Sequence, residues 1–128
     1  MTRDVITVQY PVVDDTQSLC GGEVTMTTVT PANGITIEDA FANKNNTLMI
    51  CIENTSDSDS AVTFTAGDEY PNSMLGDLEA EVLANTLYVF QVQDISRFEN
   101  KDGSINIDFD SDFSGNIFAV AKSVDLNV

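Results

Sequence analysis

The sequence has no histidine and no tryptophan, and only 5 basic residues stand against 21 acidic ones in its 128 residues. Histidine is the side chain that most often serves as a general base near neutral pH and as a transition-metal ligand. A Ser-His-Asp or Cys-His catalytic site therefore cannot be built from one chain. The formal net charge of −16 opposes binding to phosphate-rich surfaces, so we expect neither nucleic acid nor membrane as a partner.

Long apolar runs and cysteine motifs are also missing. No run approaches the ~20 apolar residues that span a bilayer, and Met1–Val5 lacks the regions of a secretory signal. We expect a soluble protein that is synthesised in a cytoplasm. Cys20 and Cys51 show no CxxC spacing and are predicted to be free thiols, with Cys51 buried in a strand. No cofactor is expected.

What the chain does contain is a series of short strand-forming segments separated by polar turns, which predicts an all-β domain. We expect a single antiparallel β-sandwich, jelly-roll or Ig-like, of seven to eight strands at residues 24–128. Residues 1–23 are an extended N-terminal arm or a first strand. The predicted strands are Val5–Tyr10, Val24–Thr30, Thr47–Ile52, Ala61–Ala66, Leu78–Leu83, Leu87–Val92, Ser104–Phe109 and Ile117–Lys122. The predicted core contains Ile50, Ile52, Phe64, Val89, Ile107 and Val120.

Three local patterns refine this prediction. Leu87–Phe90 and Ile117–Ala121 are apolar throughout, which indicates central strands or strands whose outer face meets a partner chain. Thr36–Phe41 carries a helix-capping signal and predicts one or two helical turns. Gly67 and Gly76 are predicted to bracket a loop, with at least one of them at positive φ.

The carboxylates of Asp108, Asp110 and Asp112 alternate as in a calcium-binding loop. An EF-hand then needs glycine at loop position six and glutamate at position twelve, where this chain has Phe113 and Ala119. The three acids are a weak candidate metal site, and a solvated turn is the favoured interpretation. Acids that alternate with core residues face water and form no catalytic dyad, so we predict that the protein is not an enzyme.

The N-terminal segment Met1–Val13 is apolar, and its only charged side chains, Arg3 and Asp4, cancel. One interpretation is an ordinary first strand of the domain. The other is a docking segment that lies on another protein. The candidate docking residues are Val5, Ile6, Val8, Tyr10, Val12 and Val13.

Several short motifs from residue 30 onward carry a family resemblance through their order and spacing. They are the turn Thr30–Gly34, the apolar strand ending at Ile52–Thr55, the segments Thr63–Asp68 and Gly76–Leu78, Arg97–Phe98, Gly103–Ile107 and the strand end Val120–Ala121. Together they resemble the small β-sandwich head-decoration and accessory virion proteins of tailed bacteriophages. Met1–Val29 has no counterpart in the resemblance.

The resemblance implies a non-enzymatic structural protein on the capsid surface of a virion, most simply a head-stabilising decoration protein. Its partner would be the major capsid protein or another virion protein, with a homo-oligomer as a further option. The alternative on the same fold is a carbohydrate-binding or fibre-associated adhesion module. That alternative expects exposed aromatic rings for stacking on sugars, and the chain offers only Tyr10, Tyr70 and Tyr88 with no tryptophan.

Overall fold

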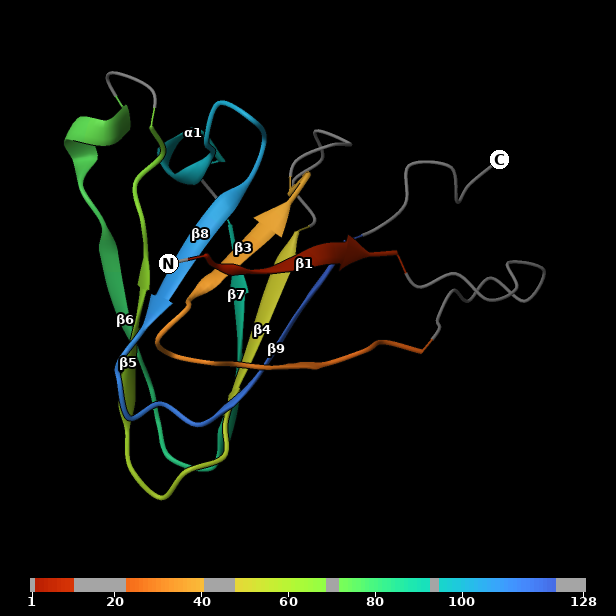
Figure 1. The fold of residues 1–128 in the computed structure, drawn as a ribbon, viewed down its shortest axis with the longest axis vertical. Helices are drawn as coiled ribbons and strands as arrows, with labels where there is room; N and C mark the ends of the chain where they lie inside the picture. Colours follow the sequence, from red (N-terminus) through yellow and green to blue (C-terminus); the bar gives the residue numbers. More distant parts are fainter. Residues whose placement is uncertain (1, 11–22, 41–47, 69–71, 93–94, 122–128) are drawn as a thin grey trace.

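The computed structural model describes residues 2–10, 23–40, 48–68, 72–92 and 95–121. The described chain forms one mixed β-sheet of nine strands that curls until it is nearly barrel-shaped (Figure 1). The all-β prediction is confirmed. The strands are β1 (Asp4–Gln9), β2 (Thr27–Thr28), β3 (Ile35–Glu38), β4 (Met49–Asn54), β5 (Ser60–Phe64), β6 (Leu78–Val82), β7 (Thr86–Gln91), β8 (Ile105–Phe109) and β9 (Gly115–Val120). A 3-10 turn, η2 (Asn72–Leu75), and a four-residue helix, α1 (Ile95–Phe98), complete the described elements.

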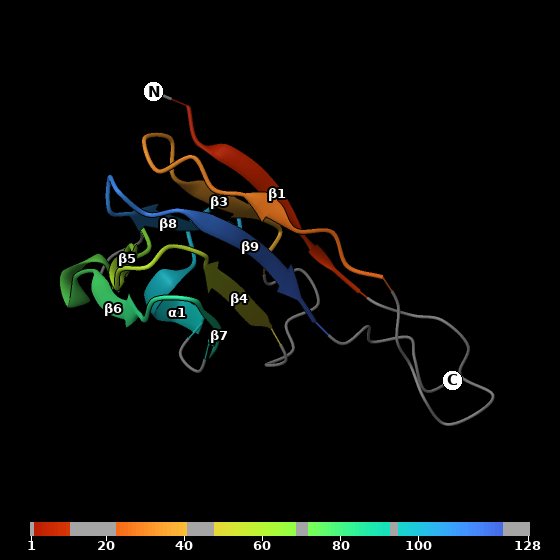
Figure 2. The same cartoon turned by 90° about the horizontal axis from the view of Figure 1, so that it is seen from below.

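Strand β1 joins two parts of the sheet. The strand order is β6-β5-β8-β3-β1-β9-β4-β7, with β2 paired to β9. Asp4–Thr7 pair with β3, and Val8–Gln9 pair with β9. We call β6, β5, β8 and β3 the first half-sheet, and β9, β4, β7 and β2 the second. Figure 2 shows β1 passing from beside β3 to beside β9.

This position of β1 changes two predictions. Residues 4–9 are an integral strand and not a free arm, which selects the first-strand alternative. Both β1 pairings are parallel, whereas the other six of the eight pairings are antiparallel, so the sheet is mixed. A purely antiparallel arrangement therefore does not describe the part of the chain that the structure covers.

The helix predicted at Thr36–Phe41 is wrong over its described residues. Ile35–Glu38 form strand β3, between β1 and β8. Ile35 and Ile37 are fully buried while Glu38 is exposed, so the segment follows the period of two that a half-buried strand requires. Pairing on both edges outweighs a local capping signal. Phe41 lies outside the described residues.

The core lies between the two half-sheets and is built from alternate, inward-facing side chains. Ile50, Ile52, Phe64 and Ile107 are buried there, as predicted. Val89 is 57% exposed and Val120 is only half-buried, so these two core predictions are wrong. Their strands are apolar on both faces, and the pattern alone does not select the inward set. The inward residues are Tyr88 and Phe90 in β7 and Ile117 and Ala119 in β9.

Asn54 organises the turns that gather at the lower end of the molecule in Figure 1. Its side chain is fully buried, and its Nδ2 donates to the carbonyl oxygens of Ser58 at 2.8 Å and Val82 at 3.1 Å. Its Oδ1 accepts from the backbone N–H of Ser56 at 3.0 Å and from the Ser56 hydroxyl at 2.8 Å. One side chain thus ties the turn after β4 to the end of β6.

The two predicted loop glycines are needed for different reasons. Gly76 has φ +76°, which confirms the positive-φ prediction. Gly67 is needed for a close backbone approach, since a Cβ there would lie 2.2 Å from the carbonyl oxygen of Glu99. The Gly67 N–H also donates to the carbonyl of Arg97 at 2.8 Å. In the described residues, no helix is long and apolar enough to cross a membrane.

Candidate docking surface and cavities

The outward side chains of the second half-sheet are mostly apolar. The register places Val89, Cys51 and Phe118 side by side across β7, β4 and β9. Leu87 and Val89 are 50% and 57% exposed. We define the apolar face by the outward residues Leu87, Val89, Met49, Cys51, Phe118 and Val120. β7 ends the described strand order, so its outer edge has no strand partner among the described residues.

Only one of the outward side chains in β4, β7 and β9 is charged. Glu53 lies between Leu87 and Asn116, and its Oε1 accepts a hydrogen bond from Asn116 Nδ2 at 2.9 Å. Cys51, at the centre of the apolar face, is 6% exposed, and desolvation raises the pKa of its thiol. The thiol therefore stays protonated near neutral pH and adds no charge to the face.

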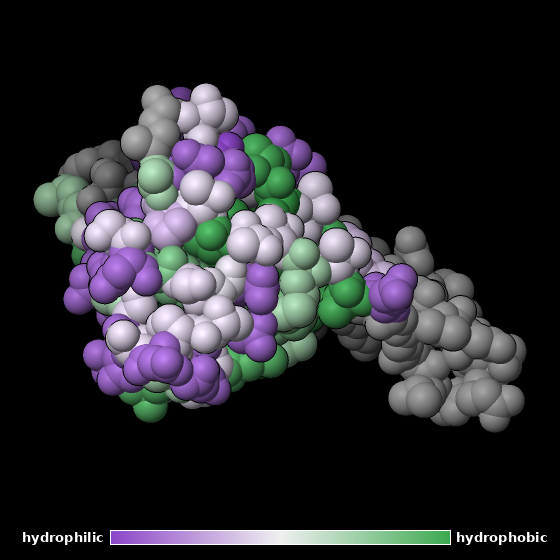
Figure 3. Space-filling view, turned by 60° about the horizontal axis from the view of Figure 1, so that its bottom comes forward, coloured by the Kyte–Doolittle hydropathy of each residue, from purple (hydrophilic) through white to green (hydrophobic). Residues whose placement is uncertain are grey.

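The first half-sheet has the opposite character. Its register brings Thr63 opposite both Asp108 in β8 and Glu79 in β6, and Glu81 follows on the same side of β6. Figure 3 shows a surface on which green hydrophobic patches are interrupted by purple hydrophilic residues and white ones. Acids thus line the outside of one half-sheet, whereas the other presents an almost uncharged surface.

The predicted carboxylate cluster is divided among different partners. Asp108 forms an ion pair with Arg3, with 2.5 Å between Oδ1 and Nη1. Asp110 Oδ2 accepts a hydrogen bond from the Ala61 N–H at 3.1 Å, and Asp112 is exposed. Within the described ranges, no three acidic, cysteine or histidine side chains are grouped closely enough to hold a metal ion.

The candidate docking residues of the N-terminal segment do not form one surface. Val5 is 53% exposed, whereas Ile6 and Val8 are 9% exposed and belong to the core. Tyr10 is half-buried and packs against the core. Val12 and Val13 lie outside the described residues. Of this set, Val5 is the described residue most accessible to another molecule, because alternate side chains of an integral strand point inward.

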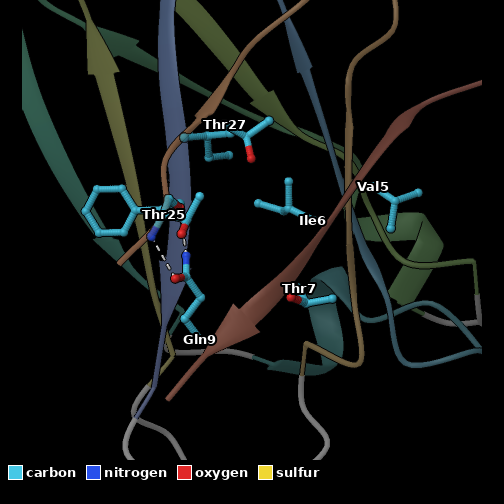
Figure 4. A pocket seen from close by; sticks show the side chains of 8 residues that line it. Val5, Ile6, Thr7, Gln9, Thr25 and Thr27 are labelled. Carbon is cyan, nitrogen blue, oxygen red and sulfur yellow. Dashed lines mark hydrogen bonds between the residues drawn. The ribbon is translucent and has the colours of Figure 1, made fainter. Parts of the chain in front are cut away.

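An open cavity of about 350 Å³ lies where β1 and β2 diverge along β9. At this fork, Gln9 Nε2 donates to the Thr25 carbonyl and the Thr25 N–H donates to Gln9 Oε1, both at 2.8 Å (Figure 4). The side-chain amide of Gln9 thus makes the pair of hydrogen bonds to the Thr25 backbone that a neighbouring strand would otherwise make. The cavity wall carries no charged side chain and consists of Val5, Ile6, Thr7, Gln9, Thr25, Thr27, Ile117 and Phe118. Val5 and Phe118 share this wall, so the exposed part of β1 borders the apolar face.

A polar cavity of about 480 Å³ lies beside the first half-sheet. Asp102, in its wall, accepts hydrogen bonds from the Ser104 hydroxyl at 2.6 Å and the Ser104 N–H at 3.1 Å. These bonds lower the pKa of the Asp102 carboxyl because they favour its ionised form. The wall consists of Arg3, Thr36, Ala66, Asp68, Asn100, Asp102, Ser104 and Asn106.

Comparison with protein-family models, with curated proteins and with solved structures finds no significant match to this chain. The assignment of the apolar face as the candidate docking surface therefore rests on the register of its strands and the exposure of its side chains. The continuous apolar runs of β7 and β9 indicate either central strands or a partner-facing surface. β7 ends the described strand order and is not central there, and the partner-facing interpretation stays a prediction. The contributions of Met49 and Cys51 had no separate sequence signal, because β4 looks like a strand buried on both faces.

Proposed function

We propose that this protein is a non-enzymatic structural protein of a virion that decorates the outside of a tailed-phage head. The observation that carries the proposal is the apolar face, in a chain whose net charge is −16. The single carboxylate among the outward side chains of its strands, that of Glu53, accepts a hydrogen bond from the amide of Asn116. Exposed apolar surface of this kind, rimmed by polar residues, marks interaction sites in proteins. The proposed partner is the major capsid protein or another virion protein.

Charge explains why docking uses this side of the molecule. Burying an unpaired carboxylate is costly, so acidic surfaces such as the outer side of β6 are poor contact surfaces. The exposed acids of the turns, including Asp57, Asp59, Asp110 and Asp112, would then point away from the particle. The same charge keeps free copies apart before assembly. Binding through the apolar face should change little with moderate salt.

The sequence resemblance adds a second line of support. Its motifs begin before β3 and extend to the end of β9, and two of them lie in β4 and β9, which are strands of the apolar face. We propose that the two half-sheets correspond to the layers of the sandwich, jelly-roll or Ig-like, that the decoration proteins have. We also propose that Val5 contributes at the margin of the contact, next to Phe118.

Co-sedimentation with phage heads that lack this chain tests the proposal. Wild-type protein should bind until its sites are saturated, and Val89→Asp should lose binding because a charge enters the contact. Met74→Asp is the matched control, since it adds the same charge at an apolar side chain that is 72% exposed in η2, outside the apolar face. Loss of binding in both variants, or in neither, contradicts docking through the apolar face. Size-exclusion chromatography of the wild type and of Val89→Asp shows whether the substitution instead dissociates a homo-oligomer of this chain.

The carbohydrate-binding alternative is favoured by one observation, the hydroxyl, amide and carboxylate groups of the polar cavity, which are the groups that bind sugar hydroxyls. No aromatic ring lies in that wall, however, and stacking rings are expected in sugar sites. Glycan-array binding that is abolished by Asn106→Ala, together with no binding to heads, would favour the alternative over the decoration role.

A further inference from the structure

A separate apolar cavity of about 310 Å³ lies where the curled sheet does not close. β6 and β7 are the two ends of the described strand order, and no described hydrogen-bonded pairing joins them. Figure 2 shows α1 between these two strands. The wall consists of Phe64, Leu78, Phe90, Gln91, Val92, Arg97 and Phe98.

Three phenylalanine rings make this wall apolar and well defined. The centroid of Phe64 lies 5.1 Å from that of Phe90, in an edge-to-face arrangement, and 6.1 Å from that of Phe98. Tyr88 stacks on Phe90 with 5.9 Å between centroids. Rings that hold one another in this way form a preformed surface, which lowers the cost of ordering the site when a ligand binds.

Arg97 brings to this wall a positive charge that no acid among the described residues neutralises. Its Nη2 lies 3.3 Å from the Gly76 carbonyl oxygen and 3.5 Å from that of Leu75, and its guanidinium lies 5.4 Å from the Phe98 ring centroid. Its Nε is buried and has no hydrogen-bond partner among the described residues. The single ion pair among the described residues joins Arg3 to Asp108, so no described acid neutralises Arg97. In a chain with 21 acids, a guanidinium that lies in the wall of a cavity without a described acidic partner indicates a site for an external anion.

We propose that this cavity binds a small apolar molecule that carries one carboxylate. The apolar part lies against Phe64, Phe90 and Phe98, and the carboxylate pairs with the guanidinium of Arg97 in the same wall. The volume of about 310 Å³ is roughly twice that of an engineered ~150 Å³ cavity that holds benzene, which sets the ligand size at about ten heavy atoms. Medium-chain carboxylates such as octanoate have this size and charge. The proposal is independent of the docking role, because the cavity lies at the open gap and not on the apolar face.

Titration of the full chain with octanoate, followed by NMR, tests the assignment. We expect saturable binding, with the largest shifts at the guanidinium N–H groups of Arg97 and at the three phenylalanine rings. Octan-1-ol has the same chain without the charge and should bind about tenfold more weakly, since a charge-assisted hydrogen bond is lost. Absence of saturable octanoate binding overturns the proposal, as does equal affinity for octanol.

Two variants localise the effect. Arg97→Met keeps an unbranched apolar stem, removes the guanidinium with its charge and should abolish the preference for octanoate over octanol. Lys101→Met makes the same change in net charge at an exposed position outside this wall and should keep the preference. A preference that persists in Arg97→Met overturns the role of Arg97. The comparison of the two ligands on the wild-type chain decides the proposal even if Arg97→Met fails to fold.

Discussion

Replacing Asn54 with alanine should destabilise the fold by about 2–5 kcal/mol. The Val82 carbonyl would lose a buried donor, which costs about 1–3 kcal/mol. The Ser58 carbonyl and the Ser56 N–H are less deeply buried, and we assign each about 0.5–1 kcal/mol because water can partly replace the lost partner. Asn54→Asp should be at least as damaging, since it places an acceptor opposite two carbonyls in a fully buried position.

Urea unfolding followed by far-UV circular dichroism measures this effect as a lower midpoint at unchanged slope. Ser56→Ala is the matched control, because it removes only the hydroxyl contacts and should cost about 0.5–1.5 kcal/mol. An Asn54→Ala protein within about 0.5 kcal/mol of wild type would refute the reasoning, since effects of that size are ordinary for surface changes. It would mean that water or a shift of the turn satisfies the Val82 carbonyl.

Three further predictions concern the core, the backbone and the thiol. Phe64→Ala should cost roughly 3–5 kcal/mol in the same unfolding assay, and a loss below about 1 kcal/mol would contradict the position of Phe64 in the core. Gly67→Ala should cost more than Gly76→Ala, because its Cβ would overlap the Glu99 carbonyl whereas Gly76→Ala meets only the positive-φ penalty of roughly 1–2 kcal/mol; the reverse order in melting temperature would contradict the close approach. Cys51 should react slowly with a thiol reagent at pH 8 in the native protein, because its pKa is raised. The folded state then holds the Cys51 thiol proton more tightly than the unfolded state does. The contribution of this proton to stability is therefore complete below the unfolded pKa of ~8.5 and declines as the pH rises above it. Rapid labelling of the native protein would contradict the raised pKa.

Much of the strand content could be predicted because alternation and turn residues are local signals. β5 and β8 lie close to their predicted limits, since Val62 and Phe64, and Ile105 and Ile107, alternate with polar residues. β3 could not be assigned correctly from local signals alone. Its two buried isoleucines are consistent with a strand, but the deciding fact is its pairing with β1 and β8, both distant in sequence.

The candidate sites were less accessible to sequence reasoning. The run Leu87–Phe90 indicates either a central or a partner-facing strand, and only the strand order shows that β7 is not central among the described strands. The position of Val5 beside an apolar surface also depends on long-range pairing of β1. Nothing in the local sequence marks Arg97 as a cation without an acidic partner in the described part of the chain, because that property depends on which acids the fold places within reach.

The most direct test of the central claim is a cryo-EM reconstruction of phage heads saturated with this protein. The account predicts density for the nine-stranded domain on the outer surface of the capsid, with β7, β4 and β9 against the major capsid protein. The turn that contains Asp57 and Asp59 should point away from the shell. Density in which β7 faces solvent while β5 and β6 contact the capsid, or heads without bound domain at saturating protein, would contradict the account.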